Sequence, residues 1–179
     1  FNMKNKLLVI TGPSGVGKTV LANHLVETIG IKRCVTCTSR MPRKFEKDGV
    51  DYFFLSRSDF EATIQSNGFI EFNEHYGTLY GLRATDLDAL LLKKPVLLVM
   101  NWEGAKKLEA QYNADVIFVE PKNISVLSER LVKRSGHDDR IKYAQSDLAQ
   151  AEQFSCRLVN DELQIAMQDI VAWANSKIS

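Results

Sequence analysis

The residues best suited to chemistry lie in a glycine-rich segment at positions 12–19. It reads GPSGVGKT and fits the pattern G-x-x-x-x-G-K-[ST] at every fixed position. Glycines let successive backbone N–H groups converge on one anion, and a following helix N-terminus adds a favourable partial charge. The segment therefore predicts a nucleoside triphosphate site, and the alternative is a glycine-rich turn that binds nothing. The expected binding residues are Gly12, Pro13, Ser14, Gly15, Val16, Gly17, Lys18 and Thr19.

Lys18 and Thr19 have separate expected tasks. The lysine ammonium can reach the β- and γ-phosphates, and the threonine hydroxyl can enter the shell of a Mg²⁺ ion. The flanking elements fit this interpretation, because LLVI at 7–10 predicts a buried strand and Leu21 and Leu25 recur at helical spacing. We expect Lys18 to be catalytic, Thr19 to be a metal ligand and Mg²⁺ to be the cofactor.

A basic insert begins shortly after this unit. Arg40 and Arg43 stand near its start with two lysines, and Tyr52 and Tyr80 lie toward its far end. Arginine forks match the oxygens of a phosphate, and tyrosine hydroxyls can complete the cradle. The alternative is a solvated basic loop, but a triphosphate loop elsewhere in the chain favours a second, phosphate-bearing substrate.

Glu71 stands in an apolar run, Phe-Ile-Glu-Phe. A carboxylate accepts two parallel hydrogen bonds, and among the common bases only guanine offers adjacent N–H donors, at N1 and N2. Glu71 is therefore a candidate for reading guanine, and the alternative is an exposed strand glutamate.

Arg134 and Arg140 flank a polar break, Ser-Gly-His-Asp-Asp. A loop that carries arginines could close over transferring phosphates and exclude water. The alternative is an ordinary connection between two helices.

The rest of the chain alternates between strand and helix patterns. Apolar runs at 95–100 and 115–119 are typical of parallel strands buried on both faces. This order predicts an α/β fold with a parallel sheet, helices on both faces and an inserted arm at 39–82. In detail we expect one second strand at 32–38, and helices that begin at caps formed by Ser58, Thr85 and Asn101.

Composition narrows the class of protein. A chain of 179 residues most simply forms one domain, and a net charge of +1 argues against holding nucleic acid by overall charge. No apolar run approaches the ~18 to 20 residues that span a bilayer. Cys34 and Cys37 have C-x-x-C spacing but lie in a strand-like run, where they face opposite ways. We therefore expect reduced thiols in a cytoplasmic protein, with a redox or metal pair as the alternative.

Together these motifs resemble the guanylate kinase family of P-loop nucleoside monophosphate kinases. In that family a GMP-binding arm and a lid close over a P-loop core, and ATP phosphorylates GMP to GDP. The resemblance implies a single domain at 3–179, with a core at about 3–38, 83–133 and 155–179, an arm at about 39–82 and a lid at about 134–154. It rests on GPSGVGKT, TSRMPR, DGVDYFF, the FIE run at 69–71, YGTLYG at 76–81 and Val159-Asn160-Asp161.

The resemblance also implies roles for individual residues. The catalytic residues would be Lys18, Arg40, Arg134 and Arg140, the last two being lid arginines. The GMP phosphate would be held by Arg40, Arg43, Tyr52 and Tyr80, and the guanine would be read by Glu71 and Thr36, with Asn101 also contacting GMP. Asn160 would lie near the adenine of ATP.

This chain departs from the family at three points. Leu82 stands where the family usually has Ser or Thr, which helps to read guanine. Val99-Met100-Asn101 stands where the family has Asp-x-Asp, whose first carboxylate helps to orient the waters of Mg²⁺. The lid is also several residues shorter, and Glu103 is a candidate to take over part of the metal role.

The predicted activity is phosphoryl transfer from ATP to GMP or dGMP, without a nucleic-acid or membrane partner. Leu82 and Asn101 motivate one alternative, a kinase of the same fold with a different monophosphate acceptor. A weakly active or non-catalytic guanylate-kinase-like binding domain is another, and the presence of Lys18 and Thr19 argues against it.

Overall fold

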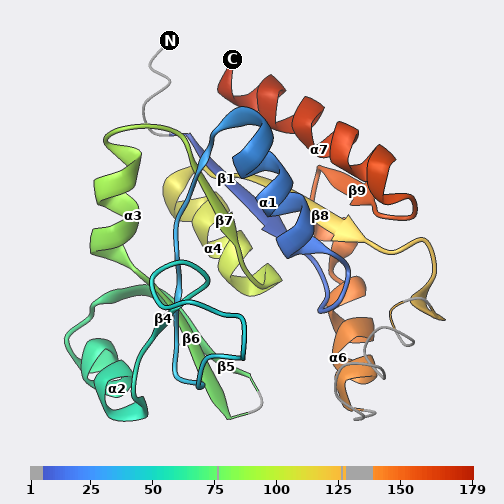
Figure 1. Ribbon diagram of the computed structural model, residues 1–179. Coiled ribbons are helices and arrows are strands. Elements are labelled where there is room, and N and C mark those ends of the chain that lie inside the picture. Colours follow the sequence, from blue (N-terminus) through green and yellow to red (C-terminus); the bar gives the residue numbers. More distant parts are fainter. Residues whose placement is uncertain (1–5, 76, 126, 128–138) are drawn as a thin grey trace.

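The computed structural model describes residues 6–75, 77–125, 127 and 139–179 (Figure 1). In this part of the chain a larger parallel sheet carries helices on both faces, and a smaller mixed sheet adjoins it. The predicted fold class is therefore confirmed. Among the described helices, none has the length and apolarity needed to span a bilayer.

The larger sheet has the strand order β2-β7-β1-β8-β9, and every neighbouring pair is parallel. The central strand β1 is buried at every position, as expected for an uninterrupted apolar run. The strands are β1 (Leu7–Thr11), β2 (Lys32–Arg33), β7 (Val96–Val99), β8 (Asp115–Glu120) and β9 (Arg157–Val159).

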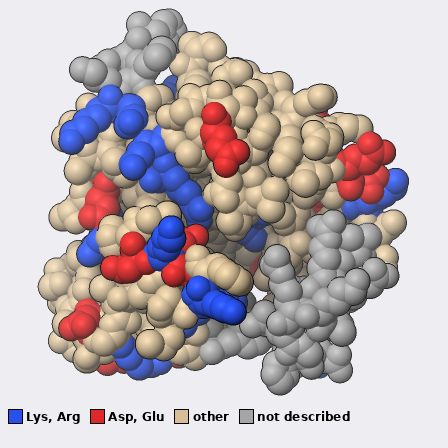
Figure 2. Space-filling view, in the orientation of Figure 1, with Lys and Arg blue, Asp and Glu red and all other residues tan. Residues whose placement is uncertain are grey.

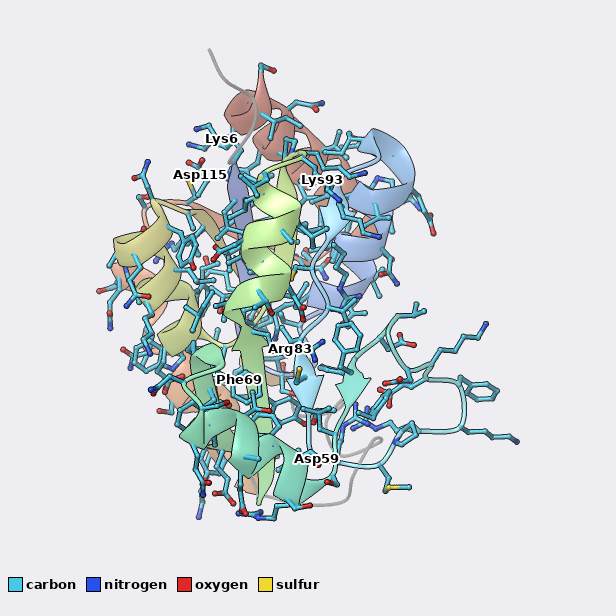
Figure 3. All side chains as sticks on the ribbon, turned by 90° about the vertical axis from the view of Figure 1, so that its left-hand side faces the viewer. Lys6, Asp59, Phe69, Arg83, Lys93 and Asp115 are labelled. Atoms are coloured by element: carbon cyan, nitrogen blue, oxygen red, sulfur yellow. The ribbon has the colours of Figure 1, made fainter. Side chains whose placement is uncertain are left out.

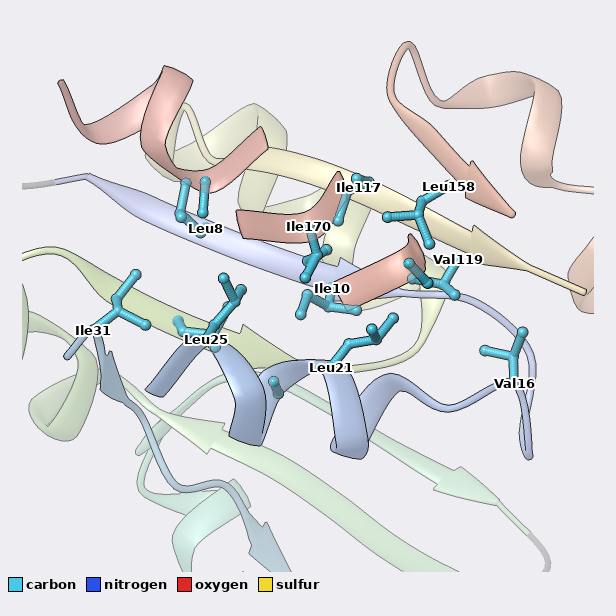
Figure 4. Packing of buried hydrophobic residues seen from close by; sticks show 14 of the residues in the cluster. Leu8, Ile10, Val16, Leu21, Leu25, Ile31, Ile117, Val119, Leu158 and Ile170 are labelled. Atoms are coloured by element: carbon cyan, nitrogen blue, oxygen red, sulfur yellow. The ribbon is translucent and has the colours of Figure 1, made fainter. Parts of the chain in front are cut away.

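Alternate residues of β1 pack against different helices, because neighbouring side chains of a strand point to opposite faces. Leu8 and Ile10 join a fully buried cluster with α1 (Lys18–Ile29) and α7 (Leu163–Ile178) (Figure 4). On the other face, β1 packs with α3 (Ala84–Leu91) and α4 (Trp102–Tyr112). Each fully buried leucine or isoleucine contributes roughly 1.5–3 kcal/mol of transfer free energy, so this packing anchors α1 and the loop before it.

The smaller sheet has the strand order β4-β3-β6-β5. β5 and β6 form an antiparallel hairpin, and β3 joins β6 to β4. Its elements are β3 (Cys37–Thr38), β4 (Phe53–Phe54), α2 (Arg57–Gln65), β5 (Phe69–His75) and β6 (Thr78–Arg83).

A separate apolar cluster stabilises the smaller sheet. Phe60 of α2 is fully buried and stacks on Phe69 of β5, with ring centroids 4.4 Å apart. A Cβ at Gly81 would lie 2.8 Å from Phe69 and 2.9 Å from Phe60, so only glycine lets β6 pass this stack. Arg83 lies where β6 meets α3, with its guanidinium 4.3 Å from the Phe53 ring centroid (Figure 3).

After β8 the described chain continues with α6 (Asp139–Leu148), a 3₁₀ helix (Ala151–Gln153), β9 and α7. In Figure 1, α6 and the smaller sheet both extend beyond the end of the larger sheet at which the loop after β1 lies. This end of the larger sheet therefore brings together the loop after β1, α6 and the smaller sheet.

The predicted strand at 32–38 is wrong as a single element. Its first part, β2, pairs with β7, and the Cys34 amide still donates to Leu97 O at 2.9 Å. From Thr36 the backbone pairs with the smaller sheet instead, since Thr36 O accepts a hydrogen bond from Phe53 N at 2.9 Å. One alternating run is thus divided between two sheets.

Two of the three predicted helix caps are wrong. α2 is capped by Ser56, whose Oγ accepts from Asp59 N at 3.1 Å, so Ser58 lies inside the helix. α3 begins after Arg83 with no side-chain cap, which places Thr85 in its first turn. The cap at Asn101 is confirmed, because its Oδ1 accepts from Gly104 N at 3.1 Å.

Candidate active site

The loop after β1 has the backbone that its glycines predict. Gly12 has φ +135°, and a Cβ at this position would lie 2.2 Å from Val119 O of β8. Gly17 has φ +105°, and its Cβ would lie 2.5 Å from Nδ2 of Asn160. Gly12 therefore excludes a side chain by backbone conformation and by space, and Gly17 disfavours one on both grounds. The loop leads into α1 directly, which places the positive end of that helix at the site.

Lys18 is folded back over its own loop. Its Nζ donates to Gly12 O at 2.6 Å and to Pro13 O at 2.7 Å. Burial lowers the pKa of Lys18 to about 8, and the carboxylate of Asp147 on α6 opposes that shift. The ammonium is thus held at the loop by two neutral carbonyls, which an anionic phosphate would outcompete.

Asp147 is a carboxylate that sequence reasoning did not single out. Burial raises its pKa to about 6, while Lys18 lowers it and Glu103 raises it. It therefore connects α6 electrostatically to the loop and to the start of α4. No sequence motif marks it, because its importance depends only on where α6 packs.

Asn160 is hydrogen-bonded to the loop at residues 12–19. Its side chain is buried, and its Nδ2 donates to Val16 O at 2.8 Å. Thr19 in contrast is exposed in the first turn of α1, where its hydroxyl can be reached from solvent. The described residues contain no group of three or more His, Cys, Asp or Glu that could hold a metal ion.

Arg40 is fixed by a carboxylate on its own loop. Its Nη1 and Nη2 donate to the two oxygens of Glu46 at 2.6 and 2.7 Å, and Nη1 also donates to Met41 O at 3.1 Å. These contacts lower the pKa of Glu46 to about 2, and hydrogen bonds to Glu46 and Tyr80 raise the pKa of Arg40. Nε of Arg40 is buried and has no hydrogen-bond partner among the described residues.

The predicted phosphate-binding side chains gather around this guanidinium. Arg40 lies 5.1 Å from the ring centroid of Tyr52, whose ring is 6.0 Å from that of Tyr80. The backbone N–H of Arg43 donates to Glu46 at 2.8 Å, and its side chain is exposed. Figure 2 shows Lys and Arg side chains, with acidic ones beside them, around a hollow between the core and the smaller sheet.

Glu46 was also missed in the sequence. The run from Arg40 to Lys47 reads as basic, and one glutamate within it looks like an ordinary surface charge. Its spacing of three residues from Arg43 is the available signal, since a carboxylate at that distance can bond back to a turn's backbone N–H.

Glu71 is buried, so the alternative of an exposed strand glutamate is wrong. Burial raises its pKa to about 7, with Lys107 lowering it and Glu103 raising it. A Cβ at Gly104 would lie 3.0 Å from Oε2 of Glu71, so this glycine lets the N-terminus of α4 approach the carboxylate. Leu82 pairs with Glu71 across the hairpin and is fully buried.

The remaining predicted residues differ in how far the structure describes them. Asn101 uses Oδ1 to cap α4 and donates from Nδ2 to Glu103 at 2.8 Å. Thr36 is half-buried beside β3. Arg134 lies outside the described residues, and of Arg140 only the backbone, at the start of α6, is described. Both lid arginines stay predictions.

The two cysteines of the C-x-x-C segment are separate buried thiols. Cys34 packs in the core beneath α3 and α4, whereas Cys37 packs with Phe60 in the smaller sheet. Burial raises the pKa of Cys34 to about 12 and that of Cys37 to about 11. Such thiols are protonated and poor metal ligands.

A parallel sheet, a P-loop at the carboxyl end of its central strand and a second cluster of phosphate-type ligands define a P-loop nucleotide kinase. The family model described as Guanylate kinase matches residues 4–176. A Thermus thermophilus guanylate kinase is 38% identical over 178 residues, covering 95% of this chain and 80% of the relative. One from Chlorobium chlorochromatii is 34% identical over 176 residues, covering 93% of each chain.

A solved structure supports the same assignment. The crystal structure of guanylate kinase from Anaplasma phagocytophilum matches with a TM-score of 0.82 at 27% identity, covering 98% of this chain and 87% of that one. The chain belongs to the guanylate kinase family.

Proposed function

We propose that this protein transfers the γ-phosphoryl group of ATP to the phosphate of GMP or dGMP, giving ADP and GDP or dGDP. The observation that carries this proposal is the pair of strands β5 and β6. They hold a buried carboxylate, Glu71, on the same hairpin as Tyr80 of the arginine–tyrosine cluster. A nucleoside monophosphate requires one group that recognises its base and a second group that binds its phosphate, and this hairpin carries residues for both.

The donor nucleotide binds at the P-loop in this proposal. The phosphates of ATP take the place of the Gly12 and Pro13 carbonyls as partners of Lys18, which then neutralises charge on the β- and γ-phosphates. Asn160 keeps Val16 in position through its hydrogen bond to the Val16 carbonyl, and in this proposal it lies near the adenine of ATP. Arg134 and Arg140 close over the transferring group from the lid.

The acceptor binds at the smaller sheet. Its phosphate contacts Arg40, Arg43, Tyr52 and Tyr80, and Glu71 accepts from N1–H and N2–H of the guanine, with Thr36 and Asn101 beside it. Glu46 accepts from both terminal nitrogens of Arg40, Nη1 and Nη2, and so fixes the orientation of the guanidinium beside Tyr52. The domain division follows from these roles, with a core at about 3–38, 83–133 and 155–179, an arm at about 39–82 and a lid at about 134–154.

The residues present fit a Mg²⁺ ion that arrives with the nucleotide. Thr19 offers an exposed hydroxyl at the N-terminus of α1, and Asp147 places a carboxylate close enough to shift the pKa of Lys18. Mg²⁺ commonly keeps several waters and takes few protein ligands beside substrate phosphates, so no protein cage is needed. When bound, the metal supplies neutralisation of the phosphate charge.

Positioning and electrostatics suffice for the chemical step. An oxygen of the acceptor phosphate attacks Pγ, and the bond from Pγ to the bridging oxygen of ADP breaks. The acceptor phosphate has a second pKa of about 6, so it is largely dianionic at pH 7 and needs no strong general base. The protein's task is to bring two polyanions into line and to exclude water.

An acceptor panel tests this function. ADP release is measured with GMP, dGMP, AMP, CMP and UMP, each with and without Mg²⁺. We expect turnover with GMP and dGMP only, and only with the metal. A kinase of the same fold for a different monophosphate, which Leu82 and Asn101 motivate, would prefer another member of the panel, and a binding domain would release ADP with none.

A further inference from the structure

Four side chains form a two-by-two array on one face of the β5–β6 hairpin. Glu71 pairs with Leu82, and Asn73 pairs with Tyr80. Because alternate residues of a strand share a face and directly paired residues lie on the same side, all four face the same way. Asn73 is thus the neighbour of both Glu71 and Tyr80.

Asn73 has a hydrogen bond that orients its amide. Its Nδ2 donates to Oε1 of Glu71 at 3.5 Å, and the contact is partly buried. An ionised carboxylate only accepts hydrogen bonds, so the NH₂ group, not the carbonyl, faces Glu71. An NH₂ group has two N–H donors, and one of them suffices for this contact. The second can donate to an atom that lies beside the carboxylate.

Guanine presents such an atom. The edge that offers N1–H and N2–H to a carboxylate continues with the acceptor O6. Leu82, the residue paired with Glu71, is apolar and fully buried, so it cannot donate to O6. Among the four side chains of the array, only Asn73 carries N–H donors adjacent to Glu71.

We propose that Asn73 reads the 6-oxygen of the acceptor base, donating from Nδ2 to O6 while Glu71 accepts from N1–H and N2–H. The proposal rests on the proposed function, because it specifies how GMP is selected at that site. It also explains discrimination against adenine, whose 6-amino group is a donor and whose N1 is an acceptor. With adenine, the N–H donor of Asn73 would face the donor 6-amino group, and the carboxylate of Glu71 would face the acceptor N1.

Two modified acceptors, tested on the wild-type protein and on Asn73→Ala, distinguish the contact of Asn73 with O6 from the contact of Glu71 with N2–H. In 6-thio-GMP a sulfur, which is a weak acceptor, replaces O6, and IMP lacks the 2-amino group. We expect the wild-type protein to prefer GMP over 6-thio-GMP about tenfold in kcat/KM, the scale of one hydrogen bond in a desolvated site. In Asn73→Ala this ratio should fall to near one, while the preference for GMP over IMP, which belongs to Glu71, stays unchanged.

The controls make each outcome decisive. Asn175→Ala replaces an exposed asparagine of α7, far along the chain from the array, and should leave every ratio unchanged. An unchanged KM for ATP shows that Asn73→Ala is folded. If the ratio of GMP to 6-thio-GMP is unchanged in Asn73→Ala, or falls in step with the ratio of GMP to IMP, direct reading of O6 is wrong. If the wild-type protein turns over no GMP, the proposed function itself fails.

Discussion

The two halves of the proposed site are built from different parts of the polypeptide. In the donor half, residues 12–19, one continuous segment supplies backbone N–H groups and a lysine held by two carbonyls of that same segment. In the acceptor half, side chains come from β5, β6 and the loop at 40–46. The donor half is therefore a backbone site, and the acceptor half is a side-chain site.

The two halves also differ in where their carboxylates lie. The donor half contains no carboxylate of its own and depends on Asp147 of α6 to support the pKa of Lys18. Two carboxylates of the acceptor half, Glu46 and Glu71, have pKa values that are shifted in opposite directions. The pKa of Glu46 is lowered to about 2 by Arg40, and that of Glu71 is raised to about 7 by burial. In the donor half, the substitutions with the largest effects should be those that change the loop backbone or Lys18. In the acceptor half, they should be those that change the charge of Glu46 or Glu71.

The largest effect is expected from Lys18→Ala. This change removes the donor half's cation next to the transferring phosphates, so kcat should fall about a thousandfold. The fold should stay intact, because among the described residues the hydrogen bonds of this side chain go to two carbonyls of its own loop. Steady-state kinetics and circular dichroism measure the two quantities. Lys94→Ala, at an exposed lysine after α3, is the control, and full activity of Lys18→Ala would contradict the role of the P-loop.

A matched pair of glycine substitutions tests the backbone character of the donor half. Gly17 and Gly30 both have positive φ, but only at Gly17 does an added Cβ meet a side chain, that of Asn160. Each change to alanine should cost about 1–2 kcal/mol in the free energy of unfolding, measured in urea. Only Gly17→Ala should also raise the KM for ATP, by at least tenfold. Equal KM values in the two variants would remove the link between Asn160 and loop geometry.

In the acceptor half, Glu46→Gln should raise the KM for GMP about tenfold and leave the KM for ATP unchanged. The glutamine amide offers only one acceptor oxygen, so the two-point contact that orients Arg40 is lost. Glu61→Gln, which breaks an exposed ion pair with Arg57 on α2, is the matched control. A lower KM for GMP in Glu46→Gln would mean that Glu46 competes with the acceptor phosphate instead of positioning Arg40.

The smallest expected effect is a shift in pH dependence. Glu71 must be ionised to accept from guanine, so kcat/KM for GMP should rise with pH through the pKa of about 7. Glu103 raises that pKa and Lys107 lowers it. Glu103→Gln should therefore move the rise to lower pH, and Lys107→Gln should move it to higher pH, by a few tenths of a unit each.

The pH profiles are measured at saturating ATP and compared between variants. Ionisation of the acceptor phosphate contributes equally to all of them, so the differences report the protein alone. Glu71→Gln should lose the dependence that belongs to the protein. Shifts in the same direction for Glu103→Gln and Lys107→Gln would show that Glu71 is not the titrating group.

Local patterns predicted the secondary structure around residues 12–19 well. The apolar run of β1, the glycine loop and α1 follow each other without interruption, so no distant contact is needed to recognise them. The Asn101 cap was readable for the same reason. The run at 32–38 was not, because its alternation fits a strand in either sheet, and only the partners Leu97 and Phe53 divide it.

The acceptor half was predicted as a set of residue types and not as an arrangement. Arg40, Tyr52, Tyr80 and Glu71 were expected near a monophosphate, but the pairing of Arg40 with Glu46 was not foreseen. Asn73 was passed over for a similar reason. Its position beside Glu71 and Tyr80 follows from the register of β5 against β6, which could not be predicted from the sequence of the hairpin.

By itself the sequence determined the P-loop, the order of strands and helices, and the side chains available for a second substrate. Backbone conformation depends on neighbours along the chain, which explains why these features could be read directly. The tertiary structure decided that Glu46 pairs with Arg40, that Asn160 supports the loop from 144 residues away, and that Glu71 is buried against α4. Pairing and desolvation depend on groups brought together from distant segments, and those distances exist only in the folded chain.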